Sequence, residues 1–197
     1  MINDHQKVLL SIVKSYNHLS EISSELFLIN SIIKHFPKEG FITKENVYDE
    51  SEYFLLEGLL HKCNYTNDGD SITTGFYLPG SVITPNFARN INGKSTFAIQ
   101  ALLESDMAII PVSALDKLRS KYEDIKIFGK RVVERELTKS VNQEIAFRAH
   151  SAKERLLSLR NEYPNLENLV PHTIIASYLG ITPVSFSRLR NDLAQSK

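Results

Sequence analysis

The sequence predicts an α+β protein: an N-terminal β-roll or jelly-roll barrel with flanking helices, then one long helix, then a C-terminal helix-turn-helix. Short runs rich in β-branched and aromatic residues alternate with turn sequences from Ser31 to Pro111. The stretch from Glu123 to about Ala149 has no proline and one glycine. Two short amphipathic segments then flank Gly180. With 197 residues, 42% of them hydrophobic, the chain can bury the core of one large domain or two modest ones.

The N-terminal part combines two helices with the strands. Residues 5–16 and 20–29 place apolar side chains at helical spacing, which predicts two amphipathic helices. The strand-like runs that follow are SIIKHF, FIT, YFLLEGLLHKCNYT, SITTGFYL, STFAIQALL and MAII. Several short strands separated by turn residues are typical of a sandwich or a rolled barrel. The turn at 67–70 is the strongest hairpin signal, and residues 113–122 predict a further short helix.

The predicted long helix at 123–149 carries apolar residues that step by four along one stripe. At 1.5 Å per residue it would be ~39 Å long, which exceeds what a small barrel needs for cover. Two interpretations are open: the helix packs on its own barrel, or it forms a coiled-coil-like seam with a second copy of the chain, which we favour. The candidate dimer-interface residues are Val133, Leu137, Val141 and Ile145.

A domain boundary is predicted at His150–Ser151. Ser151 and Glu154 form the pattern of a capping box, so a new helix should begin there. Pro164 should end this helix, and residues 165–170 link it to the final stretch. The expected domains are therefore residues 1–150, a strand-rich barrel with its long helix, and residues 151–197, a helix-turn-helix domain.

The final stretch, PHTIIASYLGITPVSFSRLRNDL, has the spacing of a helix-turn-helix. Ala176 is small where two helices would approach, and Gly180 suits a tight turn between them. Thr182 and Pro183 suit the N-cap and the first residue of the second helix. A helical hairpin that merely closes a core would explain the apolar positions equally well, but not the residues of the opposite face.

The opposite face of the second helix is suited to DNA. Hydroxyls and unpaired backbone N–H groups at a helix start suit phosphates, the Arg188 guanidinium suits the O6/N7 edge of guanine, and Val184 suits a thymine methyl. Arg190 lies nearer the buried side, so we expect it to form a structural ion pair or to contact a phosphate. The candidate DNA-binding residues are Thr182, Val184, Ser185, Ser187, Arg188, Arg190 and Asn191.

Composition excludes several classes of site. Basic and acidic residues both number 23, although residues 139–197 hold eight basic against five acidic residues. The lone Cys63 excludes an intramolecular disulfide, an iron–sulfur cluster and a cysteine zinc site. The six histidines lack paired metal-site spacing, and no nucleophile elbow or phosphate loop is present, so we expect no metal and no enzyme activity. Without a signal-peptide pattern or a run of ~18 apolar residues, a cytoplasmic protein without membrane contact is expected.

The order of barrel, long helix and helix-turn-helix resembles the Crp/Fnr family of bacterial transcription regulators from about Leu19 to Leu193. AKERLLSL and IASYLGITPVSFSRLR carry this resemblance near the C-terminus, and the second motif is the specific one. The resemblance implies a homodimer joined along the long helices, which reads a palindromic operator in double-stranded DNA, with RNA polymerase as a further partner. The positions of the family's common base readers hold Pro183, Val184 and Arg188, of which Arg188 carries over.

The resemblance implies that residues 1–150 form a cyclic-nucleotide-binding-like sensor barrel, but this barrel departs from the members of the family that bind cyclic AMP. Those members carry a Gly-Glu pair and an Arg-Ser/Thr pair where this sequence has Thr84-Pro85 and Ser95-Thr96. Without that arginine and glutamate, we expect no cyclic nucleotide. The candidate binding residues for an unidentified small-molecule effector are Thr84, Ser95 and Thr96. The sequence ends soon after the second helix, so contacts from a β-hairpin wing are not expected.

The sequence thus predicts a homodimeric, sequence-specific DNA-binding transcription regulator of the Crp/Fnr type. Its barrel would sense an unidentified ligand or serve as a structural and partner-binding module. Two alternatives from other classes are a protein-interaction adaptor with a vestigial DNA-binding domain and a small barrel enzyme. Retention on promoter DNA would separate the adaptor from the regulator.

Overall fold

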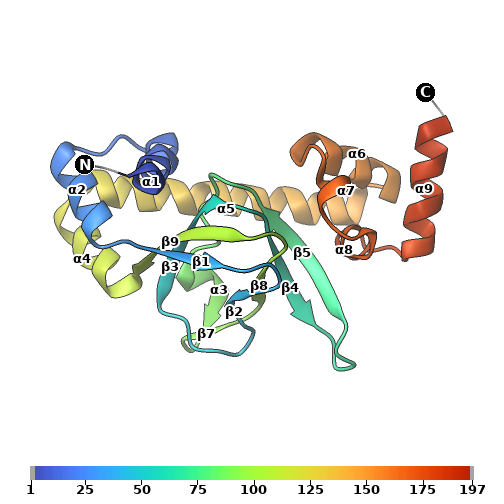
Figure 1. Ribbon diagram of the computed structural model, residues 1–197, viewed down its shortest axis with the longest axis horizontal. Coiled ribbons are helices and arrows are strands. Elements are labelled where there is room, and N and C mark those ends of the chain that lie inside the picture. Colours follow the sequence, from blue (N-terminus) through green and yellow to red (C-terminus); the bar gives the residue numbers. More distant parts are fainter. Residues whose placement is uncertain (1–2, 196–197) are drawn as a thin grey trace. The chain divides into compact units, whose positions relative to one another are not determined.

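The computed structural model describes residues 3–195, and its elements follow the predicted order of helices, strands, long helix and short helices (Figure 1). The chain separates into two compact units. One contains Met1–Lys62 and Phe76–Thr138, and the other contains Cys63–Gly75 and Lys139–Lys197. Within the described residues, no helix is both long enough and apolar enough to span a bilayer.

Two main sheets and a short ribbon make up the strand region. The first sheet has the order β1-β9-β3, from β1 (Ile32–Phe36), β9 (Ser105–Pro111) and β3 (Ser51–Glu57). The second has the order β2-β8-β4-β5, from β2 (Phe41–Thr43), β8 (Ala98–Ala101), β4 (Leu60–Tyr65) and β5 (Ser71–Tyr77). The ribbon pairs β6 (Asn90–Ile91) with β7 (Lys94–Ser95). Leu55, Leu60, Ile99 and Met107 from both main sheets share one buried cluster, which is the barrel core.

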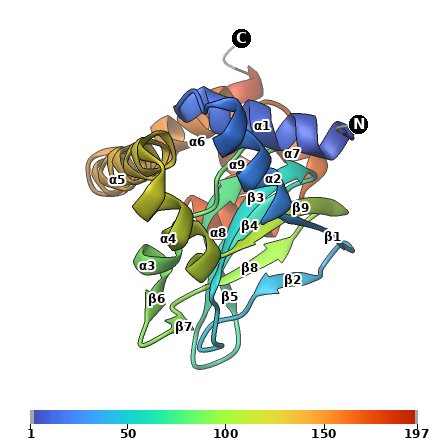
Figure 2. The ribbon, with the colours of Figure 1, turned by 90° about the vertical axis from the view of Figure 1, so that its left-hand side faces the viewer.

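Helices cover one side of the strand region (Figure 2). They are α1 (Asp4–Tyr16), α2 (Glu21–Ile29), α4 (Val112–Lys121) and the first part of α5 (Glu123–Ala149). Phe27, Phe54 and Phe128 bring α2, β3 and α5 together, with ring centroids 5.5, 5.7 and 6.3 Å apart. The predicted helices at 5–16, 20–29, 113–122 and 123–149 are confirmed to within a residue.

Local detail differs from the sequence-based expectation in two ways. The run YFLLEGLLHKCNYT forms two strands, because Gly58 turns the chain with φ +102° and a Cβ there would lie 2.1 Å from the Ser105 Oγ. Two single-turn helices, α3 (Asn86–Arg89) and α7 (Leu166–Leu169), were not predicted. Four residues are too few for helical periodicity to show in a sequence.

The C-terminal helices are α6 (Ala152–Glu162), α7, α8 (His172–Tyr178) and α9 (Pro183–Gln195). The predicted capping box at the start of α6 is confirmed: the Glu154 amide donates to the Ser151 hydroxyl at 3.3 Å, and the Glu154 carboxylate accepts from the Ser151 amide at 2.8 Å. The apolar side chains buried in these helices include Leu156, Leu159, Leu166, Ile175, Leu179 and Phe186.

Candidate nucleic-acid interface

A tight turn joins α8 to α9 and fixes the direction of the second helix. Gly180 has a φ of +65°, and a Cβ there would lie 2.9 Å from the Phe147 ring, so only glycine fits without a shift. The Ile181 amide donates to the Ala176 carbonyl at 3.0 Å. The Arg155 guanidinium donates to the Leu179 carbonyl at 2.7 Å and so caps the end of α8. The predicted helix, turn and helix are all present.

The first turn of α9 has the predicted cap. The Ser185 amide donates to the Thr182 Oγ1 at 3.1 Å, and α9 begins at Pro183, whose missing N–H costs nothing there. The two hydroxyls of Thr182 and Ser185 lie 2.9 Å apart on the surface. A polar, exposed helix start of this kind presents its N–H groups and hydroxyls to an anion.

The two faces of α9 divide as the helical wheel predicts. Phe186 is fully buried, and its ring meets that of His172 edge to face, with centroids 5.4 Å apart. Val184, by contrast, is 60% exposed although it is apolar. Within residues 3–195, Arg188 makes no ion pair or hydrogen bond. The predicted DNA-binding residues exposed on this face are Thr182, Val184, Ser185, Ser187, Arg188 and Asn191, and Asp192 and Gln195 are exposed there as well.

Arg190 is anchored within the protein. Its Nε lies 3.2 Å from the Glu167 Oε2, and its Nη1 lies 2.8 Å from the His172 Nε2. Arg160 also holds Glu167, through Nε at 2.5 Å and Nη2 at 3.1 Å. These hydrogen bonds from Arg160 hold the pKa of Glu167 below its usual range. Arg190 therefore forms the structural ion pair that was one of its two expected roles.

The predicted dimer stripe is exposed along α5. Val133 is 37% exposed, Leu137 64%, Val141 46% and Ile145 53%. Four apolar side chains in one line on a helix surface are unusual in a protein that has no partner for that surface. The stripe therefore has the exposure that an interface between two chains requires.

The three predicted effector residues all make internal hydrogen bonds. The Thr84 hydroxyl lies 2.8 Å from the Tyr77 hydroxyl and donates to the Glu136 carboxylate at 2.5 Å. The Ser95 hydroxyl donates to the Phe97 carbonyl at 2.7 Å. The Thr96 hydroxyl donates to the Arg89 carbonyl at 2.9 Å.

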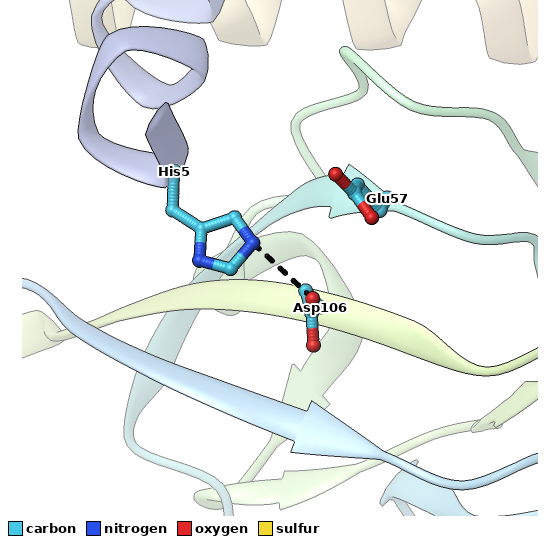
Figure 3. A group of neighbouring side chains, drawn as sticks. All are labelled: His5, Glu57 and Asp106. Carbon is cyan, nitrogen blue, oxygen red and sulfur yellow. Dashed lines mark ion pairs between the residues drawn. The ribbon is translucent and has the colours of Figure 1, made fainter. Parts of the chain in front are cut away.

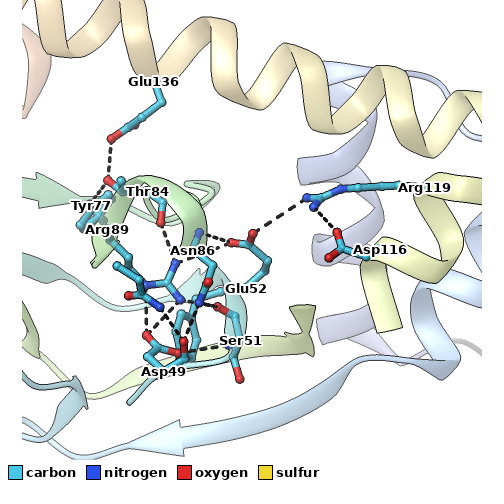
Figure 4. A network of polar contacts seen from close by, with 12 residues as sticks. Asp49, Ser51, Glu52, Tyr77, Thr84, Asn86, Arg89, Asp116, Arg119 and Glu136 are labelled. Atoms are coloured by element: carbon cyan, nitrogen blue, oxygen red, sulfur yellow. Dashed lines mark hydrogen bonds and ion pairs between the residues drawn. The ribbon is translucent and has the colours of Figure 1, made fainter. Parts of the chain in front are cut away.

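Arg89, which the sequence analysis did not single out, is the centre of this region (Figure 4). It is fully buried, and its guanidinium donates to Asp49 at 3.0 Å, to the Thr84 carbonyl at 2.7 Å and to the Ser51 carbonyl. Glu52 lies 3.6 Å from its Nη1. Burial raises the pKa of Glu52, and the charge of Arg89 opposes that rise. A single arginine on a four-residue helix gives no periodic signal, so this network could not be predicted from the sequence.

A pocket of about 210 Å³ lies beside α5 in the same unit. Its apolar lining includes Phe54, Val82 and Phe128. Its charged lining consists of Glu52, Arg119, Lys126 and Lys130, and each of the three cations is ion-paired with a carboxylate. Among the described residues, the buried Nε of Arg119 has no hydrogen-bond partner. A mostly apolar lining with a few charged groups is typical of small-molecule pockets.

Comparison with known proteins identifies the fold. No family model and no curated protein matches the sequence. Among solved structures, FixK2 from Bradyrhizobium japonicum matches with a TM-score of 0.71 and 20% identity over 84% of this chain and 85% of that one. The c-di-GMP responsive global regulator CLP of Xanthomonas campestris matches with a TM-score of 0.71 and 12% identity over 90% and 93%.

A third similar structure is a protein from Eubacterium rectale assigned to the crp/fnr family of transcriptional regulators. It matches with a TM-score of 0.70 and 18% identity over 90% of this chain and 85% of that one. These likenesses confirm the predicted fold, a barrel with flanking helices followed by a helix-turn-helix. The chain therefore has the fold of Crp/Fnr transcription regulators.

Proposed function

We propose that this protein is a homodimeric, sequence-specific DNA-binding transcription regulator of the Crp/Fnr type, without catalytic activity. The observation that carries the proposal is the contrast between two arginines of α9. Arg190 is tied to Glu167, whereas Arg188 is exposed without such a partner on a face that also presents Val184 and two serines. A helical hairpin that only closed a core would not require an unpaired guanidinium beside exposed hydroxyls.

DNA recognition would start at the first turn of α9. Thr182 and Ser185 would contact the phosphate backbone and fix the register, while Arg188 would donate two hydrogen bonds to a guanine in the major groove. Ser187 and Asn191 flank Arg188 on the exposed surface and would contact neighbouring bases or phosphates. Arg190 would hold α9 against α7 and α8 and would not read bases.

The second copy of the chain would join along α5. Burial of the exposed stripe would remove apolar surface from water. This would stabilise the dimer by roughly 25 cal/mol for each Å² of apolar surface buried. A two-fold dimer places two recognition helices on one side of the duplex, so it favours a palindromic operator. RNA polymerase is the further partner that a promoter-bound regulator would contact.

The barrel unit would carry the response to an effector. Because the Arg89 guanidinium is already paired with protein acceptors, it has little capacity for a nucleotide phosphate. The pocket beside α5, with its largely apolar lining, is a better place for a small-molecule effector. Because Val133 of the proposed dimer stripe also lines this pocket, a ligand there would act on the same helix as the dimer contact.

The experiment that tests the proposal is selection of bound sequences from a random double-stranded DNA library with the purified full chain. We expect an enriched motif with two half-sites related by two-fold symmetry, and an affinity that falls steeply with salt. An adaptor with a vestigial DNA-binding domain would enrich no motif. Absence of both an enriched motif and DNA binding in about 50 mM salt would refute the regulator.

A further inference from the structure

Three polar side chains form a row across the sheet β1-β9-β3. Asp106 on the central strand β9 lies directly opposite His35 on β1 and directly opposite Glu57 on β3. Residues directly opposite in an antiparallel pair project on the same face of the sheet. The sheet therefore brings an imidazole and two carboxylates together on one face.

A bulge sets the position of Glu57 in this row. Leu55 pairs with Met107 and Glu57 with Asp106, so Leu56 is the extra residue on β3. Bulges change the direction of a side chain and are common beside functional sites. Gly58 follows with a φ of +102°, and a Cβ there would lie 2.7 Å from the Ser105 Cα, so only glycine lets the chain turn this close to β9.

A fourth side chain reaches the row from α1. The His5 Nε2 lies 3.2 Å from the Asp106 Oδ2, while the His35 Nδ1 lies 2.8 Å from the Asp106 Oδ1. Figure 3 shows the His5 imidazole pointing from α1 toward Asp106, with Glu57 close by. Ligand atoms of His5, Glu57 and Asp106 all lie within 4.8 Å of one another. A capping box of Asn3 with Gln6 fixes the helix turn that carries His5.

The electrostatics of the row favour a cation. Two carboxylates directly opposite on adjacent strands repel each other. We propose that His5, Glu57 and Asp106 bind one divalent transition-metal ion, and that His35 orients the Asp106 carboxylate through its other oxygen. This arrangement matches protein metal sites in which a hydrogen-bonded partner fixes the orientation of a ligand.

The donor set indicates the kind of ion. One imidazole nitrogen with two carboxylate oxygens suits Zn²⁺ and its first-row neighbours better than Ca²⁺, which takes oxygen ligands only. Tetrahedral Zn²⁺ with ligand distances of about 2.1 Å needs ligand atoms about 3.4 Å apart. Rotation of the exposed Glu57 side chain would bring its carboxylate within this range, and water would complete the coordination.

The test uses the full chain without a polyhistidine tag, stripped of metal with a chelator and titrated with Zn²⁺ in a calorimeter. We expect one ion per chain, with a dissociation constant in the micromolar range or below. The ligand variants His5→Gln, Glu57→Gln and Asp106→Asn should each weaken binding by about tenfold or more, and His35→Gln by about ten- to a hundredfold. The matched control His18→Gln removes an exposed histidine outside the row and should bind as the wild type does.

Metal-free melting temperatures show whether each variant folds. Nuclear magnetic resonance of the wild type gives a readout that needs no variant, because Zn²⁺ should shift the ring signals of His5 and leave those of His18 unchanged. The proposal is wrong if the wild type binds no Zn²⁺ below about 100 μM. It is equally wrong if His5→Gln and Asp106→Asn bind Zn²⁺ as tightly as the wild type.

Discussion

Arg188 and Arg190 differ in what surrounds them more than in their positions on α9. Arg188 is exposed on the face opposite the buried Phe186, whereas Arg190 contacts Glu167 and His172. An exposed guanidinium keeps its donors for a ligand, while a paired one has already used them. The sequence predicted this division, because the helical wheel places Arg190 near Phe186 and Arg188 away from it.

Arg188→Ala should weaken binding to the selected operator by ~1–3 kcal/mol per half-site and relax the preference at one base pair, because a bidentate contact to guanine is lost. Quantitative binding to operators that differ at single positions measures both effects. Arg190→Ala is the matched control, which should lower the stability of the fold or weaken binding to all DNA sequences alike. Unchanged affinity and base preference in Arg188→Ala would mean that α9 does not read DNA through this side chain.

Glu167 should make the stability of the C-terminal helices depend on pH. Its pKa lies below the usual 4.5 because it accepts hydrogen bonds from Arg160, so its ionised form is favoured in the folded state. This contribution is present above about pH 4.5 and is lost as the pH falls through the lower folded-state pKa. The melting temperature of Glu167→Gln should therefore lie below that of the wild type at pH 7, and the difference should shrink toward pH 3.

Circular dichroism melts between pH 3 and pH 7 measure this difference. Glu144→Gln is the matched control, because Glu144 pairs with Arg148 four residues later on an exposed helix surface. Such exposed pairs contribute little to stability, so this variant should follow the wild type at every pH. If the difference in melting temperature between Glu167→Gln and the wild type does not change with pH, the role assigned to Glu167 is wrong.

At the scale of elements, length decided what the sequence could predict. The long helix α5 and the capped helix α6 carry many periodic residues or a complete cap, and both begin within a residue of the prediction. The helices α3 and α7 have four residues each and no side-chain cap, so neither signal exists for them. The same limit hid Arg89, because α3 is the element that carries it into the barrel core.

The α5 stripe predicts how the chain associates. Val141→Asp and Ile145→Asp should weaken both self-association and operator affinity, because a charge in an apolar seam is desolvated and one chain alone engages one half-site. Light scattering and DNA binding on the same samples measure the two effects. Asn142→Asp adds the same charge at a neighbouring polar position and should change neither. A wild-type chain that is monomeric at micromolar concentration would contradict the seam.

At the scale of the whole molecule, the order of barrel, long helix and helix-turn-helix could be predicted because each part has its own periodicity. The contacts between residues far apart in the sequence could not be predicted in this way. The expectation of no metal relied on histidine spacing along the chain, yet His5 and His35 meet at Asp106 only after β1, β9 and α1 are in place. Strand register determines such groups, and single-sequence patterns do not fix register.

The barrel as a whole should not respond to cyclic nucleotides. Arg89 already donates to Asp49 and to two backbone carbonyls, and Thr84 already bonds to Tyr77 and Glu136, so a phosphate would have to break several internal bonds to bind there. A ligand at 100 times its dissociation constant would stabilise the fold by ~2.7 kcal/mol. Titration of cyclic AMP or cyclic GMP to millimolar levels should therefore leave the melting temperature unchanged, with a cyclic-nucleotide-binding protein in the same buffer as the positive control. A saturable rise in melting temperature would instead show that these internal bonds give way to the nucleotide.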